Sequence, residues 1–188
     1  MTGTATRPGD PASESGAYSL GRRDWANWPR YEAAVLGFRD YWYPVTWSRK
    51  VTGKPIGVTL GGEKIMLIRE AGTVHALHDR CPHRGVPLSH EMGTQEFPGT
   101  WTCCYHGWTF DLATGVLVAA ITDGPESPIC GKVAVRTYPV EERLGLVFVW
   151  LGDGPPVPLA DDVPEELLEP GAIVLGRITE RPGNWRFR

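Results

Sequence analysis

The 188-residue sequence lacks several features that would assign it to a particular class of protein. It has little excess charge, with 19 Lys and Arg against 22 Asp and Glu, and its basic residues are scattered along the chain. Nucleic-acid-binding domains gather such residues on one face, so we expect no nucleic-acid partner. The longest apolar runs, such as residues 146–151, are far shorter than the roughly 20 residues that span a bilayer, so we expect no membrane anchor.

Cysteine is scarce, with four in the chain, and we expect no export signal. Residues 1–20 are rich in Thr, Ser, Gly, Ala and Pro without an apolar core, and we expect them to form a disordered tail. Arg22 and Arg23 precede a polar stretch, whereas a twin-arginine signal continues into a hydrophobic one. We therefore predict a cytoplasmic protein, whose thiols stay reduced and do not form a disulfide framework.

Two of the cysteines lie in short segments that also contain a histidine, residues 81–83 (CPH) and 103–106 (CCYH). Two Cys and two His suit either one zinc ion or a two-iron cluster with unequal irons. Zinc modules usually group Cys with Cys and His with His along the chain, whereas these segments mix the two types. The mixing favours a [2Fe–2S] cluster. The predicted ligands are Cys81 and Cys103 for one iron and His83 and His106 for the other.

The surrounding residues resemble the two cluster loops of Rieske proteins, specifically those of the Rieske non-haem iron oxygenases that hydroxylate aromatic rings. The resemblance implies a shell around the ligands that consists of Arg84, Gly85, Tyr105, Gly107 and Trp108. Respiratory Rieske proteins place hydroxyl donors where this chain has Trp108 and Phe110. Fewer donors to the sulfurs predict a cluster potential near the negative end of the Rieske range, about −150 mV.

Segments outside the loops, at 36–45, 151–160 and 184–186, resemble the flanks of the Rieske domain in terminal oxygenase α subunits. In that family a larger catalytic domain follows, in which two His and one carboxylate bind a mononuclear Fe(II). We expect that iron only in a longer form or a separate domain, so the 188 residues alone should not hydroxylate a substrate. The resemblance also implies a homotrimer in the full-length form, a ferredoxin or reductase as electron donor, and the oxygenase catalytic domain as acceptor.

Three functions compete at this point. The first is one-electron transfer, within an oxygenase, to a mononuclear iron that acts on an aromatic or heteroaromatic compound. The second is a freestanding Rieske ferredoxin that only carries electrons, and the third is a structural zinc module. A second iron site at His75, His78 and Asp79 is not expected, because strand alternation points His75 and His78 to opposite faces.

The remaining pattern predicts an all-β fold. Short apolar stretches separated by Gly turns indicate antiparallel sheets in a sandwich, with a cluster-binding subdomain inserted at 81–118 and a short amphipathic helix within 25–37. One more strand is expected at 172–179. The predicted organisation is a tail at 1–20, the Rieske domain at 21–154, a Pro-rich acidic linker at 155–171, and the start of a truncated or missing catalytic domain at 172–188.

Overall fold

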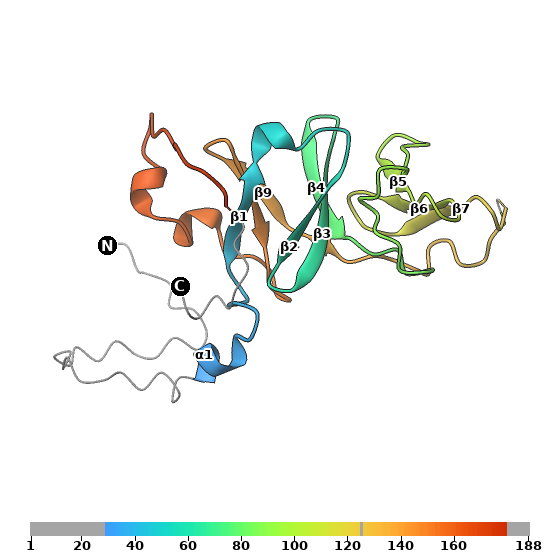
Figure 1. Ribbon diagram of the computed structural model, residues 1–188, viewed down its shortest axis with the longest axis horizontal. Coiled ribbons are helices and arrows are strands. Elements are labelled where there is room, and N and C mark those ends of the chain that lie inside the picture. Colours follow the sequence, from blue (N-terminus) through green and yellow to red (C-terminus); the bar gives the residue numbers. More distant parts are fainter. Residues whose placement is uncertain (1–28, 125, 180–188) are drawn as a thin grey trace. The chain divides into compact units, whose positions relative to one another are not determined.

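The computed structural model of the protein describes residues 29–124 and 126–179 (Figure 1). The chain divides into two units, residues 1–33 and residues 34–188. The described part of the first unit holds α1 (Pro29–Ala33), which lies within the predicted helical segment and begins with proline, a residue suited to the first turn because its missing N–H needs no partner there. The tail predicted at 1–20 lies outside the described residues.

The described part of the second unit is built from antiparallel strands in three sheets, as the sequence predicts. One sheet has the order β1-β10-β9, another β2-β3-β4-β8, and the third β5-β6-β7. The strands are β1 (Trp42–Trp47), β2 (Ile56–Leu60), β3 (Glu63–Glu70), β4 (Thr73–His78), β5 (Thr100–Thr102), β6 (Trp108–Asp111), β7 (Leu117–Ala120), β8 (Thr137–Tyr138), β9 (Val140–Arg143) and β10 (Leu146–Trp150).

Two-residue turns connect three of the strand pairs. The turn between β2 and β3 consists of Gly61 and Gly62, with φ of 54° and 80°, and the turn between β3 and β4 has Ala71 and Gly72 at 47° and 88°. Such tight turns need positive φ at both residues, because only then does their twist match that of the strands. The Gly signals in the sequence therefore located these hairpins correctly.

Strand β3 is buried on both faces and separates two hydrophobic cores. Ile65 and Leu67 belong to the core beside β10, whereas Met66 and Ile68 belong to the core beneath the third sheet. The four side chains are at most 1% exposed. Each contributes about 1.5–3 kcal/mol of stability relative to an exposed position.

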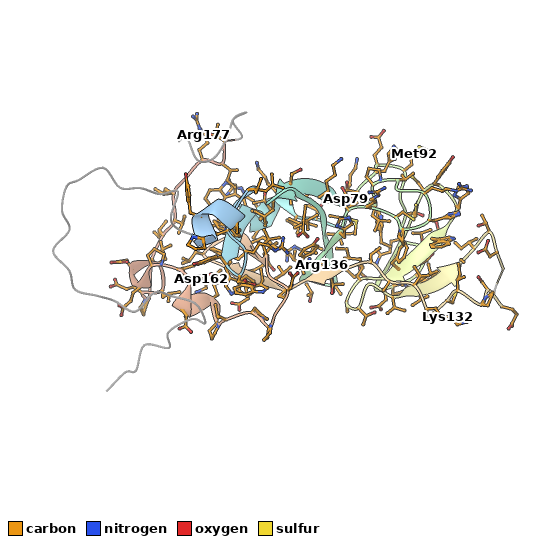
Figure 2. The ribbon with its side chains drawn as sticks, turned by 90° about the horizontal axis from the view of Figure 1, so that it is seen from below. Asp79, Met92, Lys132, Arg136, Asp162 and Arg177 are labelled. Carbon is orange, nitrogen blue, oxygen red and sulfur yellow. The ribbon has the colours of Figure 1, made fainter. Side chains whose placement is uncertain are left out.

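The third sheet is the inserted subdomain, and it lies at the end of the second unit that Met92 and Lys132 mark in Figure 2. Asp79 follows β4 directly and lies where the chain leaves the four-stranded sheet for this subdomain. Sheets β5-β6-β7 and β2-β3-β4-β8 share the core that contains Met66 and Ile68. The subdomain is therefore packed against the larger sheet and is not an independent lobe.

The segments after β10 differ in part from expectation. The predicted linker contains two short 3₁₀ helices, Leu159–Asp161 and Glu165–Leu167, and Leu159 is buried against Trp42 and Trp150. The strand predicted at 172–179 is wrong, because no strand is assigned there and the segment has no neighbouring strand to pair with. An apolar alternation indicates a strand only where a hydrogen-bonding neighbour exists.

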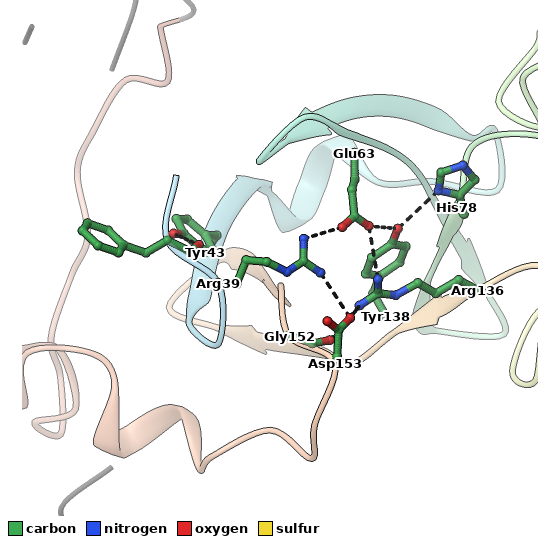
Figure 3. A network of polar contacts seen from close by, with 9 residues as sticks. Arg39, Tyr43, Glu63, His78, Arg136, Tyr138, Gly152 and Asp153 are labelled. Atoms are coloured by element: carbon green, nitrogen blue, oxygen red, sulfur yellow. Dashed lines mark hydrogen bonds and ion pairs between the residues drawn. The ribbon is translucent and has the colours of Figure 1, made fainter. Parts of the chain in front are cut away.

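A polar network joins β3, β8 and the segments around residues 39 and 153 (Figure 3). Glu63 accepts hydrogen bonds from Arg39 at 2.6 Å and from the Tyr138 hydroxyl at 2.5 Å. Asp153 lies 3.0 Å from the guanidinium of Arg136. Burial by itself would raise the pKa of Glu63, but the hydrogen bonds from Tyr138 and Arg39 and the charge of Arg136 outweigh it and leave the pKa below its usual value.

Candidate metal centre

Both predicted ligand segments fold into the same small loop. In the first loop, the Cys81 N–H donates to the carbonyl of Val86 and the Gly85 N–H donates back to the carbonyl of Cys81, both at 2.8 Å. In the second, the Cys103 N–H donates to the carbonyl of Trp108 at 2.8 Å and the Gly107 N–H donates to the carbonyl of Cys103 at 3.1 Å. Each loop thus begins at a cysteine and closes five residues later.

The fifth residue of each loop is a glycine because of its backbone conformation. Gly85 has φ of 76° and Gly107 has φ of 65°, in the left-handed region that other residues rarely adopt. A Cβ on Gly107 would also lie 2.9 Å from the Cβ of Ile121, whereas a Cβ on Gly85 would meet only the end of the Arg80 side chain, at 3.2 Å. These two predicted residues around the ligands therefore shape the loops without contributing side chains.

The four predicted ligand side chains line one narrow hollow between the loops. Of these, Cys81 and Cys103 are buried, at 2% and 3% exposed. The rings of His83 and His106 are half-buried, with centroids 4.6 Å apart. The two thiols thus lie side by side in the interior, and the two imidazoles lie side by side toward the surface.

The two thiols influence each other's ionisation. The hydrogen bond from Cys81 lowers the pKa of Cys103 to about 6, and backbone N–H groups of Tyr105 and His106 act in the same direction. The same thiol pair and then burial raise the pKa of Cys81. A thiolate is the form that binds metal, so the second loop presents a sulfur that loses its proton readily.

The residues present fit an iron–sulfur group. The Nδ1 atom of His106 is buried and has no hydrogen-bond partner among the described residues, as expected of a nitrogen meant to bind a metal. The thiol pair and the imidazole pair offer two ligands to each of two metals, as in a cluster with one Cys₂ iron and one His₂ iron.

The remaining predicted residues around the ligands also lie at this hollow. Arg84, Tyr105 and Trp108 line it, and the indole of Trp108 stacks on the imidazole of His83 with 4.6 Å between centroids and 7° between planes. The Tyr105 ring lies 4.0 Å from that of His106 and is 59% exposed. The sequence did not show that an aromatic ring from one loop covers the histidine of the other.

Several supports of the loops were missed in the sequence. The carboxylate of Asp79 accepts from the backbone N–H of Ser89 at 2.7 Å and from its hydroxyl at 2.6 Å, which ties together the two ends of the first loop. On the second loop, the hydroxyls of Thr102 and Thr109 are hydrogen-bonded to each other at 2.8 Å. Each of these contacts joins residues on opposite sides of a loop, and the only signal for them was a polar residue at each end of a loop.

Outside the hollow, the other cysteines and histidines do not assemble. Cys104 and Cys130 are half-buried, and burial followed by the neighbouring Cys103 raises the pKa of Cys104. His75 and His78 lie on β4 opposite Ile68 and Ile65. The described part of the chain also contains no helix long and apolar enough to cross a membrane.

The chain is similar to known proteins in sequence and in fold. A model of the Rieske [2Fe-2S] domain matches residues 41–139. The carbazole 1,9a-dioxygenase terminal oxygenase component of a Sphingomonas species is 43% identical over 170 residues, which cover 90% of this chain and 44% of the relative. The 3-chlorobenzoate-3,4-dioxygenase oxygenase subunit of Comamonas testosteroni is 41% identical over 117 residues, covering 61% and 26%.

Solved structures agree with the sequence relatives. The terminal oxygenase of carbazole 1,9a-dioxygenase from Novosphingobium sp. KA1 is 48% identical and superposes with a TM-score of 0.69, covering 73% of this chain and 36% of that one. The reduced complex between oxygenase and ferredoxin in carbazole 1,9a-dioxygenase is 44% identical with a TM-score of 0.68, covering 72% and 35%. The chain thus spans less than half the length of these oxygenases.

These matches confirm the fold and the [2Fe–2S] cofactor that the two loops predicted, and they confirm the similarity to ring-hydroxylating oxygenases, including the carbazole enzymes that the flanking segments resemble. The chain belongs to the Rieske [2Fe–2S] domain family.

Proposed function

We propose that the protein is the Rieske part of a ring-hydroxylating terminal oxygenase, where it receives one electron at a time from a ferredoxin or reductase and passes it to a mononuclear iron. The observation that carries this proposal is the hollow with its buried thiol pair and its half-buried imidazole pair. When bound there, a [2Fe–2S] cluster supplies a one-electron couple. The surrounding side chains hold the cluster and form the surface that its electron donor approaches.

In this proposal the four side chains have distinct roles. Cys81 and Cys103 would hold one iron, and their burial keeps water away from their sulfurs. His83 and His106 would hold the other iron, and as half-buried side chains they would be the ligands nearer to an incoming partner. Orientation of the imidazoles comes from packing, since Trp108 stacks on His83 and Tyr105 lies against His106.

The surface beside the histidines has the composition of a docking site for the electron donor. Tyr105, within the second loop, and Ile121, which donates from its N–H to the carbonyl of Gly107, are 59% and 52% exposed. Arg80, just before the first loop, and Arg84, within it, are exposed and add positive charge. An apolar centre with a basic rim favours an acidic partner, and a ferredoxin complex has been solved for the carbazole oxygenase.

The acceptor is proposed to be the oxygenase catalytic domain with its mononuclear Fe(II), in a longer form of the chain or on a separate domain. The length of the relatives supports this, because the present chain covers 44% of the Sphingomonas oxygenase component. The full-length form would then be a homotrimer that acts on an aromatic or heteroaromatic compound, carbazole being the first to test. A freestanding electron carrier is the alternative, and the same cluster site would serve it.

Metal analysis and spectroscopy test the cluster site directly. We expect two irons and two acid-labile sulfides per chain, and an EPR signal of a [2Fe–2S] cluster in the dithionite-reduced protein. The protein is also expected to accept electrons without hydroxylating carbazole in its 188-residue form. A colourless protein with one tightly bound zinc would contradict the function, and carbazole turnover by this form alone would contradict the proposed division of labour.

The docking surface can be tested through the rate of reduction by the ferredoxin of the carbazole system. Arg84→Glu should slow reduction at low salt, because it repels the acidic partner, and the difference should shrink as salt screens the charges. Arg143→Glu makes the same charge change on β9, away from the hollow, and serves as the matched control. Equal rates for the two variants would place the docking surface elsewhere.

A further inference from the structure

The indole of Trp108 presents an unpaired donor at the cluster site. Its Nε1 atom is buried and has no hydrogen-bond partner among the described residues, and Trp108 lines the hollow together with the four predicted ligands. Buried N–H groups almost always find an acceptor, so an orphaned one calls for an explanation. His106 Nδ1 is the other orphaned side-chain atom among the described residues, and it belongs to the same hollow.

The position of the indole is set by its surroundings and leaves it little freedom to turn away. Its ring lies parallel to that of His83, at 7° and 4.6 Å, and Trp108 begins β6, whose register with β7 pairs it with Ala120. The backbone carbonyl of Trp108 is already engaged by the N–H of Cys103. A ring held by a strand, a loop closure and a stacking partner keeps its N–H at the hollow.

Other tryptophans show that this protein does satisfy its indole donors. The buried Trp101 donates from Nε1 to the carbonyl of Leu88 at 2.7 Å, and Trp42 donates to the carbonyl of Val157 at 2.7 Å. Trp150 reaches the carbonyl of Gly154 at 3.2 Å. Trp108 differs from these three in that the space beside it is the space of the cofactor.

We propose that the Trp108 indole N–H is a hydrogen-bond donor to the sulfur atoms of the bound cluster and raises its reduction potential. This inference rests on the proposed cluster site and deepens it. The reduced cluster carries one more negative charge than the oxidised one, so a donor to its sulfurs stabilises the reduced form more. The sequence predicted no donor at Trp108, because tryptophan has no hydroxyl. The indole N–H of Trp108 supplies the donor instead.

Pulsed EPR with selective labelling tests the contact itself. The protein is produced with tryptophan labelled with ¹⁵N in the indole ring only, its cluster is reduced, and weak ¹⁵N couplings are recorded. We expect a ¹⁵N coupling that is absent in Trp108→Phe. The control is Trp101→Phe, which removes an indole that already has an acceptor and should retain the coupling. A reduced cluster without any indole coupling, or with one that survives in Trp108→Phe, overturns the proposal.

Protein-film voltammetry measures the consequence. Phenylalanine can still stack on His83 but has no N–H, so Trp108→Phe should lower the equilibrium constant for reduction about tenfold, which is about 59 mV for a one-electron couple. Trp108→Leu removes stacking as well and separates the two effects. An unchanged potential in Trp108→Phe, with a normal visible spectrum, refutes the donor role while leaving the cluster assignment intact. A protein without any [2Fe–2S] signal refutes both.

Discussion

The two cluster loops have the same backbone and different supports. Each starts at a cysteine whose N–H and carbonyl are bonded to residues five and four positions later, and each turns at a glycine with positive φ. The first loop is braced from outside by the Asp79 carboxylate on Ser89. The second is braced by the neutral hydroxyls of Thr102 and Thr109 and by Ile121, whose N–H donates to the Gly107 carbonyl and whose side chain leaves no room for a Cβ on Gly107.

The comparison shows how one site can be built from two separate pieces of sequence. A common loop geometry brings one thiol and one imidazole from each piece to the hollow, and the histidine follows its cysteine by two residues in the first loop and by three in the second. The different supports then determine how each loop responds to mutation. The first loop depends on a charge, and the second depends on tight packing.

Removing a ligand should have the largest effect and should not distinguish the loops. Cys81→Ser and Cys103→Ser should each lose the cluster, because binding energy at such a site is also folding energy. Visible absorption and iron content measure the loss, and Cys104→Ser and Cys130→Ser serve as controls that keep both. Retained colour in either of the first two variants would show that the ligand set is wrong.

Replacing the turn glycines with alanine should destabilise the two loops by different amounts. Gly85→Ala should cost about 1–2 kcal/mol for a left-handed residue, whereas Gly107→Ala should cost about 2–4 kcal/mol, because its Cβ also meets the Cβ of Ile121. Chemical denaturation of the cluster-loaded protein gives both free energies of unfolding. Combining Gly107→Ala with Ile121→Ala should recover part of the difference, and equal costs for the two glycines would remove the packing argument.

The hydrogen bonds that support the two loops, Asp79 to Ser89 and Thr102 to Thr109, should contribute differently to stability. Asp79→Ala should destabilise the protein by about 2 kcal/mol, since it removes two hydrogen bonds to a charged group, and Thr109→Val should cost about 1 kcal/mol. Asp79→Asn keeps one acceptor oxygen and is expected to fall between Asp79→Ala and the wild type. Thermal unfolding followed by circular dichroism measures these changes. A larger loss of stability in Thr109→Val than in Asp79→Ala would show that the Thr102–Thr109 hydrogen bond is the stronger support.

Acid should produce the smallest effect, and it acts through the polar network beside β4. Because the pKa of Glu63 lies below its ordinary value of 4.5, its contribution to stability is complete above pH 4.5 and is lost as pH falls through the lowered pKa. The melting temperature should therefore drop less steeply below pH 4.5 in Glu63→Gln than in the wild type. Parallel curves for the two proteins would show that Glu63 contributes nothing to acid sensitivity.

Much of this structure was predictable because its signals are local. Short apolar stretches, glycine pairs such as Gly61 and Gly62, and the two mixed Cys and His segments each carry their own information. The bond from Asp79 to Ser89 and the stacking of Trp108 on His83 were not predictable, because each joins residues across a loop or between loops. The strand wrongly expected at 172–179 failed for the same reason, since pairing depends on a neighbour that local pattern does not reveal.

Strand β3 has a consequence for how the protein loses its structure. Its alternate side chains belong to two cores, so neither core can melt while the other keeps this strand in place. The subdomain that carries the loops is therefore not a flap that can open for repair or exchange of its cofactor while the rest stays folded. Colour and fold should disappear in a single cooperative transition, which makes the cofactor's absorbance a direct reporter of the intact chain.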